Sequence, residues 1–326
     1  MARKPKNPER RKLIVLGVVL AILLGPLMIP VSTSGTLDYR EAAGPDATFF
    51  KSQSIDIHYE LTTASASCPE PGKLVVLIHG FGASTFSWRS VEDKFSDCDD
   101  VISYDRPAFG LTERALSWQE VNPYSMQAQM AILGDLIAKF AKQREVVLVG
   151  HSAGGAIAAQ FALDNPSKVS KLVLEAPAIL NGTPGAGSSW YTYIPQLNHV
   201  GPLLVSSIAS SGMNLLSESY HDTSKLTDET IAGYRVPLTI KNWEFAFWEF
   251  SRADRATNVA VRLLEFQMPV MIITGDDDRV VETALSRELA KKMPEAEFVE
   301  ISNSGHLPHE ETVDEFMAAV LPFVNN

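Results

Sequence analysis

The sequence predicts an α/β protein with a largely parallel sheet, and three features of the 326-residue chain indicate it. Short apolar segments alternate with segments of helical periodicity between residues 74 and 178. The motif G-x-S-x-G, with Ser152 at its centre, lies between one such apolar segment and a helical one. About ninety residues without strand character then precede two further apolar segments, which is too long for an ordinary connection and indicates an insertion.

The individual elements follow from the composition of each segment. Residues 49–51 and 55–61 are predicted to form antiparallel edge strands, and a helix over 124–142 leads into the strand before Ser152. Uninterrupted apolar residues are typical of strands buried on both faces. Largely apolar segments predict strands at 74–78, 101–104, 146–149, 171–176 and 270–274, and the alternating residues 296–301 predict one more.

The context of Ser152 makes its motif informative. A strand over 146–149 precedes it, and the helix-forming residues 156–163 follow it. A sharp turn from strand to helix strains the central residue and needs small neighbours, which the flanking glycines supply. This arrangement exposes a serine hydroxyl at the edge of the sheet, so Ser152 is a candidate nucleophile.

An acid and a histidine follow Ser152 in the order that this architecture requires. Three consecutive aspartates, Asp276 to Asp278, come directly after the strand at 270–274. His306 and His309 come after the strand at 296–301. The sequence therefore holds the components of a serine, histidine and carboxylate triad.

Four further motifs agree with a known family in type and order. They are H-G-F-G at 79–82, Y-D-R-P-A-F-G at 104–110, G-D-D-D at 275–278 and S-G-H-L-P-H-E at 304–310. With G-x-S-x-G, they make the chain resemble the α/β-hydrolase family, in its capped branch of epoxide-hydrolase-like and C–C-hydrolase-like proteins, from about residue 49 to the C-terminus.

The resemblance implies a fold and a domain organisation. We expect a mostly parallel eight-stranded sheet with helices on both faces, formed by residues 48–178 and 269–326. A helical cap, or lid, is expected over residues 179–268.

The resemblance also implies roles for individual residues. Ser152 is expected to be the nucleophile, His306 the base, and Asp278 the acid that orients His306. The backbone amides of Phe81 and Ala153 are expected to form the oxyanion hole, and Ala153 opens the helix whose dipole favours negative charge there.

Alternatives to these roles remain open. Asp276, Asp277 and Glu175 are alternative acids, although the G-x-x-D pattern favours Asp278. His306 is preferred to His309 because it directly follows Gly305, and His309 is interpreted as a surface or supporting residue.

Aromatic residues are concentrated in the expected cap. Trp190, Trp243, Trp248 and Phe247 are candidates to line an apolar substrate site. The alternative is that each of them belongs to the core of the cap or to its docking surface.

The residue types at the site separate possible reactions. Epoxide hydrolases and haloalkane dehalogenases carry aspartate at the elbow, whereas this chain carries Ser152. C–C hydrolases of the family usually carry tryptophan after the catalytic histidine, whereas this chain carries Leu307. We therefore expect a carboxylic ester hydrolase, esterase-like or lipase-like, acting through an acyl-enzyme on a small apolar ester or lipid-like substrate. A C–C or amide hydrolase, or a ligand receptor without enzymatic activity, is the alternative.

The N-terminus combines a basic and an apolar segment. Residues 1–12 hold six Lys or Arg residues and one Glu, and residues 13–30 hold no charge. This pattern predicts a single-pass transmembrane anchor with the catalytic body on the extracytoplasmic side. A cleaved signal peptide, giving a secreted or periplasmic protein, is the alternative. Residues 31–47 are expected to be a linker.

The net charge of −11 disfavours nucleic acid as a partner. No cofactor motif and no zinc-type Cys/His spacing is present in the sequence, so neither a cofactor nor a metal is expected. Nothing in the sequence specifies an oligomeric state.

The chain has two cysteines, Cys68 and Cys98. The family topology makes the strands that follow them parallel neighbours, which implies a disulfide in an oxidising compartment. Two unrelated thiols are the alternative.

Overall fold

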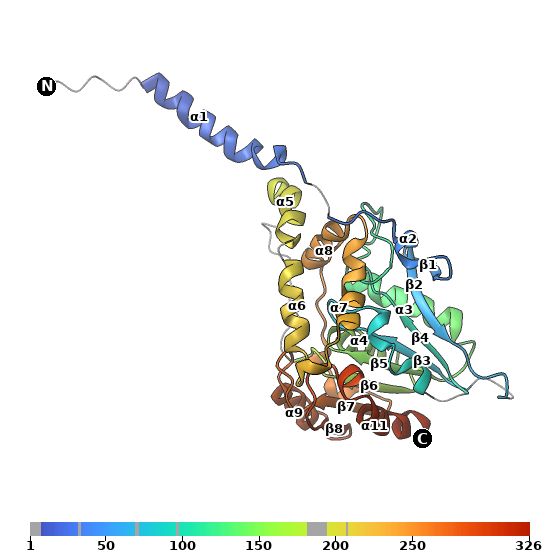
Figure 1. Ribbon diagram of the computed structural model, residues 1–326. Coiled ribbons are helices and arrows are strands. Elements are labelled where there is room, and N and C mark those ends of the chain that lie inside the picture. Colours follow the sequence, from blue (N-terminus) through green and yellow to red (C-terminus); the bar gives the residue numbers. More distant parts are fainter. Residues whose placement is uncertain (1–7, 32–33, 69–71, 96–97, 181–193, 207) are drawn as a thin grey trace.

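The computed structural model is built around one twisted sheet of eight strands in the order β1-β2-β4-β3-β5-β6-β7-β8 (Figure 1). The structure describes residues 8–31, 34–68, 72–95, 98–180, 194–206 and 208–326. The strands are β1 (Thr48–Ser52), β2 (Ile55–Thr62), β3 (Leu74–Ile78), β4 (Asp100–Tyr104), β5 (Val146–His151), β6 (Lys171–Glu175), β7 (Val270–Gly275) and β8 (Glu297–Ile301).

The sheet is mostly parallel, as expected. β1 pairs with β2 and β2 with β4 in antiparallel register, whereas every other neighbouring pair is parallel. Every residue of β3, β5 and β7 is buried, because helices cover both faces of the sheet. The carboxyl ends of these parallel strands therefore meet along one edge, where the loops that follow them carry the candidate site.

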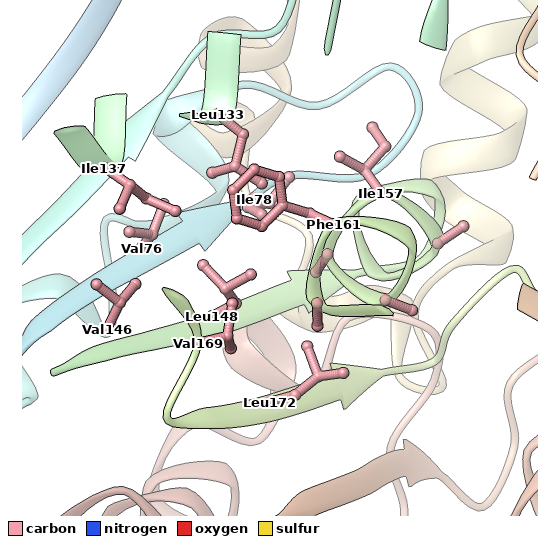
Figure 2. Close-up of a cluster of buried hydrophobic side chains, with 14 of the residues drawn as sticks. Val76, Ile78, Leu133, Ile137, Val146, Leu148, Ile157, Phe161, Val169 and Leu172 are labelled. Atoms are coloured by element: carbon pink, nitrogen blue, oxygen red, sulfur yellow. The ribbon is translucent and has the colours of Figure 1, made fainter. Parts of the chain in front are cut away.

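The two faces of the sheet are covered by different elements. One face packs against α3 (Met126–Phe140), α4 (Ala153–Asp164) and α9 (Thr283–Lys292). Figure 2 shows this core, with Phe161 of α4 lying over the strand residues Ile78 and Leu148. The other face packs against α11 (Val313–Asn325) and the short helices η2 (Thr85–Trp88) and η3 (Glu92–Lys94). The remaining short elements of the core are α10 (Pro308–Glu311), η4 (Pro166–Lys168), η8 (Val259–Val261) and η9 (Leu263–Glu265).

A helical insertion separates β6 from β7 and lies above the carboxyl edge of the sheet (Figure 1). Its residues 181–193, which include Trp190, fall outside the described part of the chain. Its described elements are α5 (Pro195–Ser206), α6 (Ile208–Glu218), η6 (Thr223–Lys225), α7 (Asp228–Arg235), η7 (Val236–Thr239) and α8 (Trp243–Arg252), and η8 and η9, which follow them before β7, pack against the core.

The N-terminal segment corrects the prediction of a transmembrane anchor. The apolar residues 13–30 do not form one helix: α1 (Pro8–Leu24) has 17 residues and includes the basic Arg10, Arg11 and Lys12, and η1 (Pro26–Met28) follows it after Gly25. A proline removes a backbone donor and clashes with the preceding turn, so α1 ends before Pro26. No helix in the described ranges has both the length and the apolarity needed to cross a membrane. The prediction of a membrane-anchored chain with an extracytoplasmic body is therefore wrong.

The segment expected to be a linker contains α2 (Tyr39–Ala43), which Asp38 caps with its side chain. Cys68 and Cys98 form a disulfide with a Cα–Cα distance of 5.6 Å, which confirms the expected pairing.

Candidate active site

Ser152 lies in the turn between β5 and α4 with φ 52° and ψ −118°, a conformation that non-glycine residues rarely adopt. Its amide donates a hydrogen bond of 2.8 Å to the carbonyl oxygen of Glu175, which ties the turn to β6. A Cβ at Gly154 would lie 2.1 Å from the carbonyl oxygen of Ile78, so only glycine allows α4 to approach β3 this closely. The sequence therefore forms the strained elbow that the motif predicts.

His306 and Asp278 form a buried pair. His306 Nδ1 and Asp278 Oδ2 are 2.7 Å apart, and the two residues are 4% and 5% exposed. Asp278 Oδ1 accepts hydrogen bonds of 2.9 Å from the amides of Val280 and Val281. An ionised Asp278 accepts the proton on His306 Nδ1, which leaves His306 Nε2 as the free acceptor. Ser152 and His306 line the same cavity.

The alternative acids lie elsewhere. Asp277 contacts His221 and Arg279, and Asp276 accepts a hydrogen bond from the amide of Ser304. Neither has a hydrogen bond to His306 in the described structure. The register of G-x-x-D thus selects the aspartate that contacts His306.

Glu175 belongs to a second carboxylate–histidine pair that the sequence did not reveal. Its Oε1 lies 2.7 Å from Nδ1 of His309, and both residues are fully buried. His309 Nε2 lies 2.8 Å from the hydroxyl of Ser87. Of the two interpretations of His309, the surface position is wrong, because α10 turns this side chain inward onto the ring of Trp88, and the interpretation as a supporting residue remains. His309 follows His306 by only three residues, so the sequence does not show which of the two histidines pairs with Asp278 and which with Glu175.

Two amides are available at the predicted oxyanion hole. Among the described residues, the backbone N–H groups of Phe81 and Ala153 donate to no protein acceptor. Phe81 lies in the loop after β3, and Ala153 is the first residue of α4. Free amides at a helix N-terminus provide positive potential for a developing oxyanion.

Two buried histidines hold these loops in place. His79 Nε2 accepts a hydrogen bond of 3.0 Å from the amide of Arg106, and burial beside Arg106 lowers the pKa of His79 to about 3. His151 Nε2 donates to the carbonyl oxygen of His306 over 2.9 Å, while burial and the neighbouring His306 lower the pKa of His151 well below its ordinary value. Both imidazoles are therefore neutral and act in positioning, His151 by fixing the His306 loop.

The cavity above Ser152 has a volume of about 190 Å³ and largely apolar walls. Its lining combines aromatic side chains with aliphatic ones, most of which come from the insertion. The aromatic side chains include Phe81, Phe109, Tyr234, Trp243 and Phe247, and the aliphatic ones include Val205, Met213, Leu216, Leu238 and Leu307.

Of the four candidate substrate residues, the structure brings Trp243 and Phe247 to this cavity. Trp248 lies on the opposite side of α8, where its Nε1 donates to Asn198 over 3.1 Å and its ring covers Gly201 of α5. Trp190 lies outside the described residues. No group of three or more His, Cys, Asp or Glu residues within the described ranges is arranged to hold a metal ion.

Comparison with known proteins identifies relatives of the whole catalytic body. A 2-hydroxy-6-oxononadienedioate/2-hydroxy-6-oxononatrienedioate hydrolase from Pseudomonas is 30% identical over 264 residues, covering 77% of this chain and 88% of that protein. The uncharacterized hydrolase YugF from Bacillus subtilis is 27% identical over 285 residues, covering 84% and 96%.

Solved structures share the fold at lower identity. The bromoperoxidase from Bacillus anthracis superposes with a TM-score of 0.66 at 20% identity, over 86% of this chain and all of that one. The sequence profile of the family described as alpha/beta hydrolase fold matches residues 73–313. The profile match, the elbow at Ser152 and the order of the strands show that the chain is a hydrolase belonging to the α/β-hydrolase family.

Proposed function

We propose that the protein is a serine hydrolase in which Ser152 is the nucleophile, His306 the general base and Asp278 the acid that orients His306. The observation that carries the proposal is the 2.7 Å pairing of His306 with Asp278 beside the cavity that holds the strained Ser152. A nucleophile, a base and an orienting carboxylate on three loops at one edge of the sheet form the set that nucleophilic catalysis needs.

The steps follow from the positions of these groups. His306 Nε2 takes the proton of the Ser152 hydroxyl as its Oγ attacks a substrate carbonyl carbon, and the resulting oxyanion accepts hydrogen bonds from the amides of Phe81 and Ala153. The bond to the leaving group breaks, and the leaving atom takes the proton from His306. Water then attacks the acyl-enzyme and gives a proton to His306. The bond between the acyl group and Ser152 Oγ breaks, Oγ takes this proton from His306, and the carboxylic acid leaves.

We propose that the bond cleaved is a carbon–carbon bond beside a ketone. The Pseudomonas relative and a 2-hydroxy-6-oxo-6-phenylhexa-2,4-dienoate hydrolase from Burkholderia cepacia, 26% identical over 269 residues, are named for oxo-dienoic acids. Such compounds contain a ketone and no ester, so attack on the ketone breaks a C–C bond. The apolar cavity suits the carbon chain or ring on the ketone.

An ester is the second candidate, and the composition of the cavity favours it. Arg114 is the one Lys or Arg among the described lining residues. Its guanidinium already donates to the carbonyl oxygens of Phe109, Gly110 and Thr112. Leu307, beside His306, adds apolar surface. A neutral acyl ester needs no cation, whereas the carboxylate of an oxo-dienoate would need one, so these walls favour the ester.

The test measures turnover of both substrate classes by the full-length protein. The C–C substrate is a 6-aryl 2-hydroxy-6-oxo-dienoate, followed by its loss of absorbance, and the esters are p-nitrophenyl acetate to decanoate. Ser152→Ala is the inactive variant. Ser251→Ala is the matched control, because Ser251 is exposed and, within the described residues, its hydroxyl bonds only to the carbonyl oxygen of Trp248.

A preference of kcat/KM for the oxo-dienoate supports C–C hydrolysis, whereas a preference for esters refutes it in favour of the second candidate. Ser152→Ala activity equal to that of Ser251→Ala, on any substrate that is turned over, contradicts the role of Ser152.

A further inference from the structure

The segment between the N-terminal helix and the sheet, residues 34–43, crosses the insertion and will be called the strap. The amides of Thr36 and Leu37 donate to the carbonyl oxygen of Thr239 over 2.8 and 3.0 Å, and the amide of Lys241 donates to Leu37 over 2.8 Å. Leu37 and Ile240 thereby form an isolated parallel bridge. The strap is thus bonded through its backbone to the turn between η7 and α8.

Ser34 holds the first turn of α8. Its amide and its hydroxyl donate to Oε1 of Glu244 over 2.6 and 2.7 Å, and its Oγ accepts the indole N–H of Trp243 over 3.0 Å. Glu244 and Trp243 are only 2% and 5% exposed. Asn242, which precedes α8, makes no side-chain capping bond. The orientation of Trp243 is therefore held by a hydrogen bond to Ser34, which lies more than two hundred positions earlier in the chain.

The other end of the strap is anchored to the sheet. The hydroxyl of Tyr39 donates to Asp56 Oδ2 over 2.8 Å, and Arg40 Nη2 lies 2.5 Å from the same oxygen. The ring of Tyr39 also packs edge-on against Phe49 of β1, with centroids 5.6 Å apart. Because Asp56 belongs to β2, the strap joins the edge hairpin of the sheet to α8.

The strap contacts the insertion at Ile240, between two groups of residues that line the cavity. Pro237 and Leu238 precede the bridge, Trp243 and Phe247 follow it, and all four line the cavity above Ser152. We propose that the strap determines substrate specificity, with Ser34 as the positioning residue that holds the Trp243 indole in the cavity wall. The inference rests on the proposed role of Ser152 as nucleophile.

Loss of the Ser34 hydroxyl has a defined consequence. The buried indole N–H of Trp243 loses its acceptor, and Glu244 loses one donor while its Oε2 already has no partner among the described residues. An unsatisfied buried donor is costly, so the indole is expected to leave its position. Ligands long enough to reach Trp243 then lose their apolar contact with the indole ring, whereas shorter ligands keep all their contacts.

The experiment uses the full-length protein and two p-nitrophenyl phosphonates, one with a methyl and one with an octyl group, which modify an activated serine whatever bond the natural substrate contains. The second-order rate constant of Ser152 modification is measured for each probe. The variants are Ser34→Ala, Ser34→Thr and the matched control Ser251→Ala, and thermal unfolding verifies that each is folded.

We expect Ser34→Ala to lower the rate constant for the octyl probe by about tenfold, the size of one lost hydrogen bond, with less than about a twofold change for the methyl probe. Ser34→Thr retains a hydroxyl and restores the octyl rate, and Ser251→Ala matches the wild type. A purely stabilising strap would lower the unfolding temperature without changing the ratio of the two rates.

Gly35→Val provides a second, independent disruption. A Cβ at Gly35 would lie 2.0 Å from the carbonyl oxygen of Ile240, so valine forces the strap away from the insertion. The same loss of octyl selectivity is expected. An octyl-to-methyl ratio unchanged by both Ser34→Ala and Gly35→Val refutes the inference while leaving Ser152 as nucleophile. A wild-type protein that neither probe modifies refutes the nucleophile proposal and the inference that rests on it.

Discussion

Asp278→Asn distinguishes the acid that serves His306 from the other carboxylates nearby. In the native site Asp278 Oδ2 faces His306 Nδ1 at 2.7 Å, and Oδ1 accepts from the amides of Val280 and Val281 at 2.9 Å. An asparagine has one oxygen and one NH₂ group in place of the two oxygens. Its single oxygen can therefore accept either from the N–H on His306 Nδ1 or from the two backbone amides, but not from both.

The hydrogen-bond count decides the orientation of the asparagine. With its oxygen toward the two backbone amides, it keeps two hydrogen bonds and presents its NH₂ group to His306. The opposite orientation keeps one bond and places N–H groups against two buried donors, at a cost of about 1–3 kcal/mol for each donor left unsatisfied. The first orientation is therefore favoured. Nδ1 of His306 must then accept, so its proton moves to Nε2, and the histidine no longer accepts the proton of Ser152.

A wrong histidine tautomer in a serine triad lowers kcat by about 10³–10⁴, which corresponds to roughly 4–5.5 kcal/mol of the activation barrier. We expect this loss for Asp278→Asn on whichever substrate the wild type turns over, measured as kcat under saturation. Glu175→Gln is the matched control, because Glu175 is equally buried and also pairs with a histidine, His309, at 2.7 Å. Its kcat should stay within about tenfold of the wild type, an order of magnitude set by one lost interaction.

A folded Glu175→Gln variant, verified by thermal unfolding, that lowers kcat as far as Asp278→Asn does would refute the specific role of Asp278. Wild-type kcat in Asp278→Asn would also refute it, since the tautomer of His306 would then not depend on Asp278.

Three further outcomes are expected. Gly154→Ala should lower the free energy of unfolding by about 3 kcal/mol or more in urea titrations, because its Cβ would meet the backbone of Ile78; Gly212→Ala, with nothing within 4 Å of the added carbon, is the control and should not destabilise. Burial raises the pKa of Glu92 from 4.5 to about 7, so the folded chain holds the extra proton and stability falls as pH rises between these values, by up to about 1.4 kcal/mol per pH unit. Glu92→Gln should remove this contribution, and an unchanged slope between pH 5 and 7 would contradict it. Replacing both Cys68 and Cys98, 30 residues apart, by serine should cost about 3–4 kcal/mol in urea unfolding, and equal midpoints for the oxidised wild type and the double variant would refute this.

Local patterns predicted the parts of the fold that depend on local geometry. The elbow at Ser152, the parallel strands and the order of acid and histidine all follow from short segments whose spacing is fixed by a turn after a strand. The prediction of an N-terminal membrane span is wrong for a local reason, because Gly25 and Pro26 lie within residues 13–30 and a proline ends a helix before it. The uncharged segment is long enough to span a membrane, but its backbone forms two helices, α1 and η1.

The insertion was harder to interpret because helical periodicity does not assign faces to partners. Trp243, Phe247 and Trp248 lie on one short helix, yet the first two face the cavity and the third faces α5. The rotation of α8 depends on Gly201 of α5, which leaves room for the ring of Trp248, and on Ser34 in the strap. Neither neighbour is close to α8 in the sequence, so the aromatic content indicated an apolar site without identifying its members.

The two carboxylate–histidine pairs show where a motif stops being sufficient. Glu175 ends β6 and Asp278 lies in the loop after β7, its parallel neighbour. His306 and His309 lie three residues apart, so sequence order permits more than one pairing. The structure resolves it through α10, which turns His309 toward Trp88 and Glu175 and leaves His306 on the loop facing the cavity. His151, wedged between both rings, donates to the backbone of His306 and so holds the loop in the register that gives each histidine its own acid. The packing beneath the site thus determines which acid pairs with which histidine. Because only Asp278 pairs with the histidine that lines the cavity, Asp278→Asn and Glu175→Gln should differ widely in kcat although the side chains of both acids are buried.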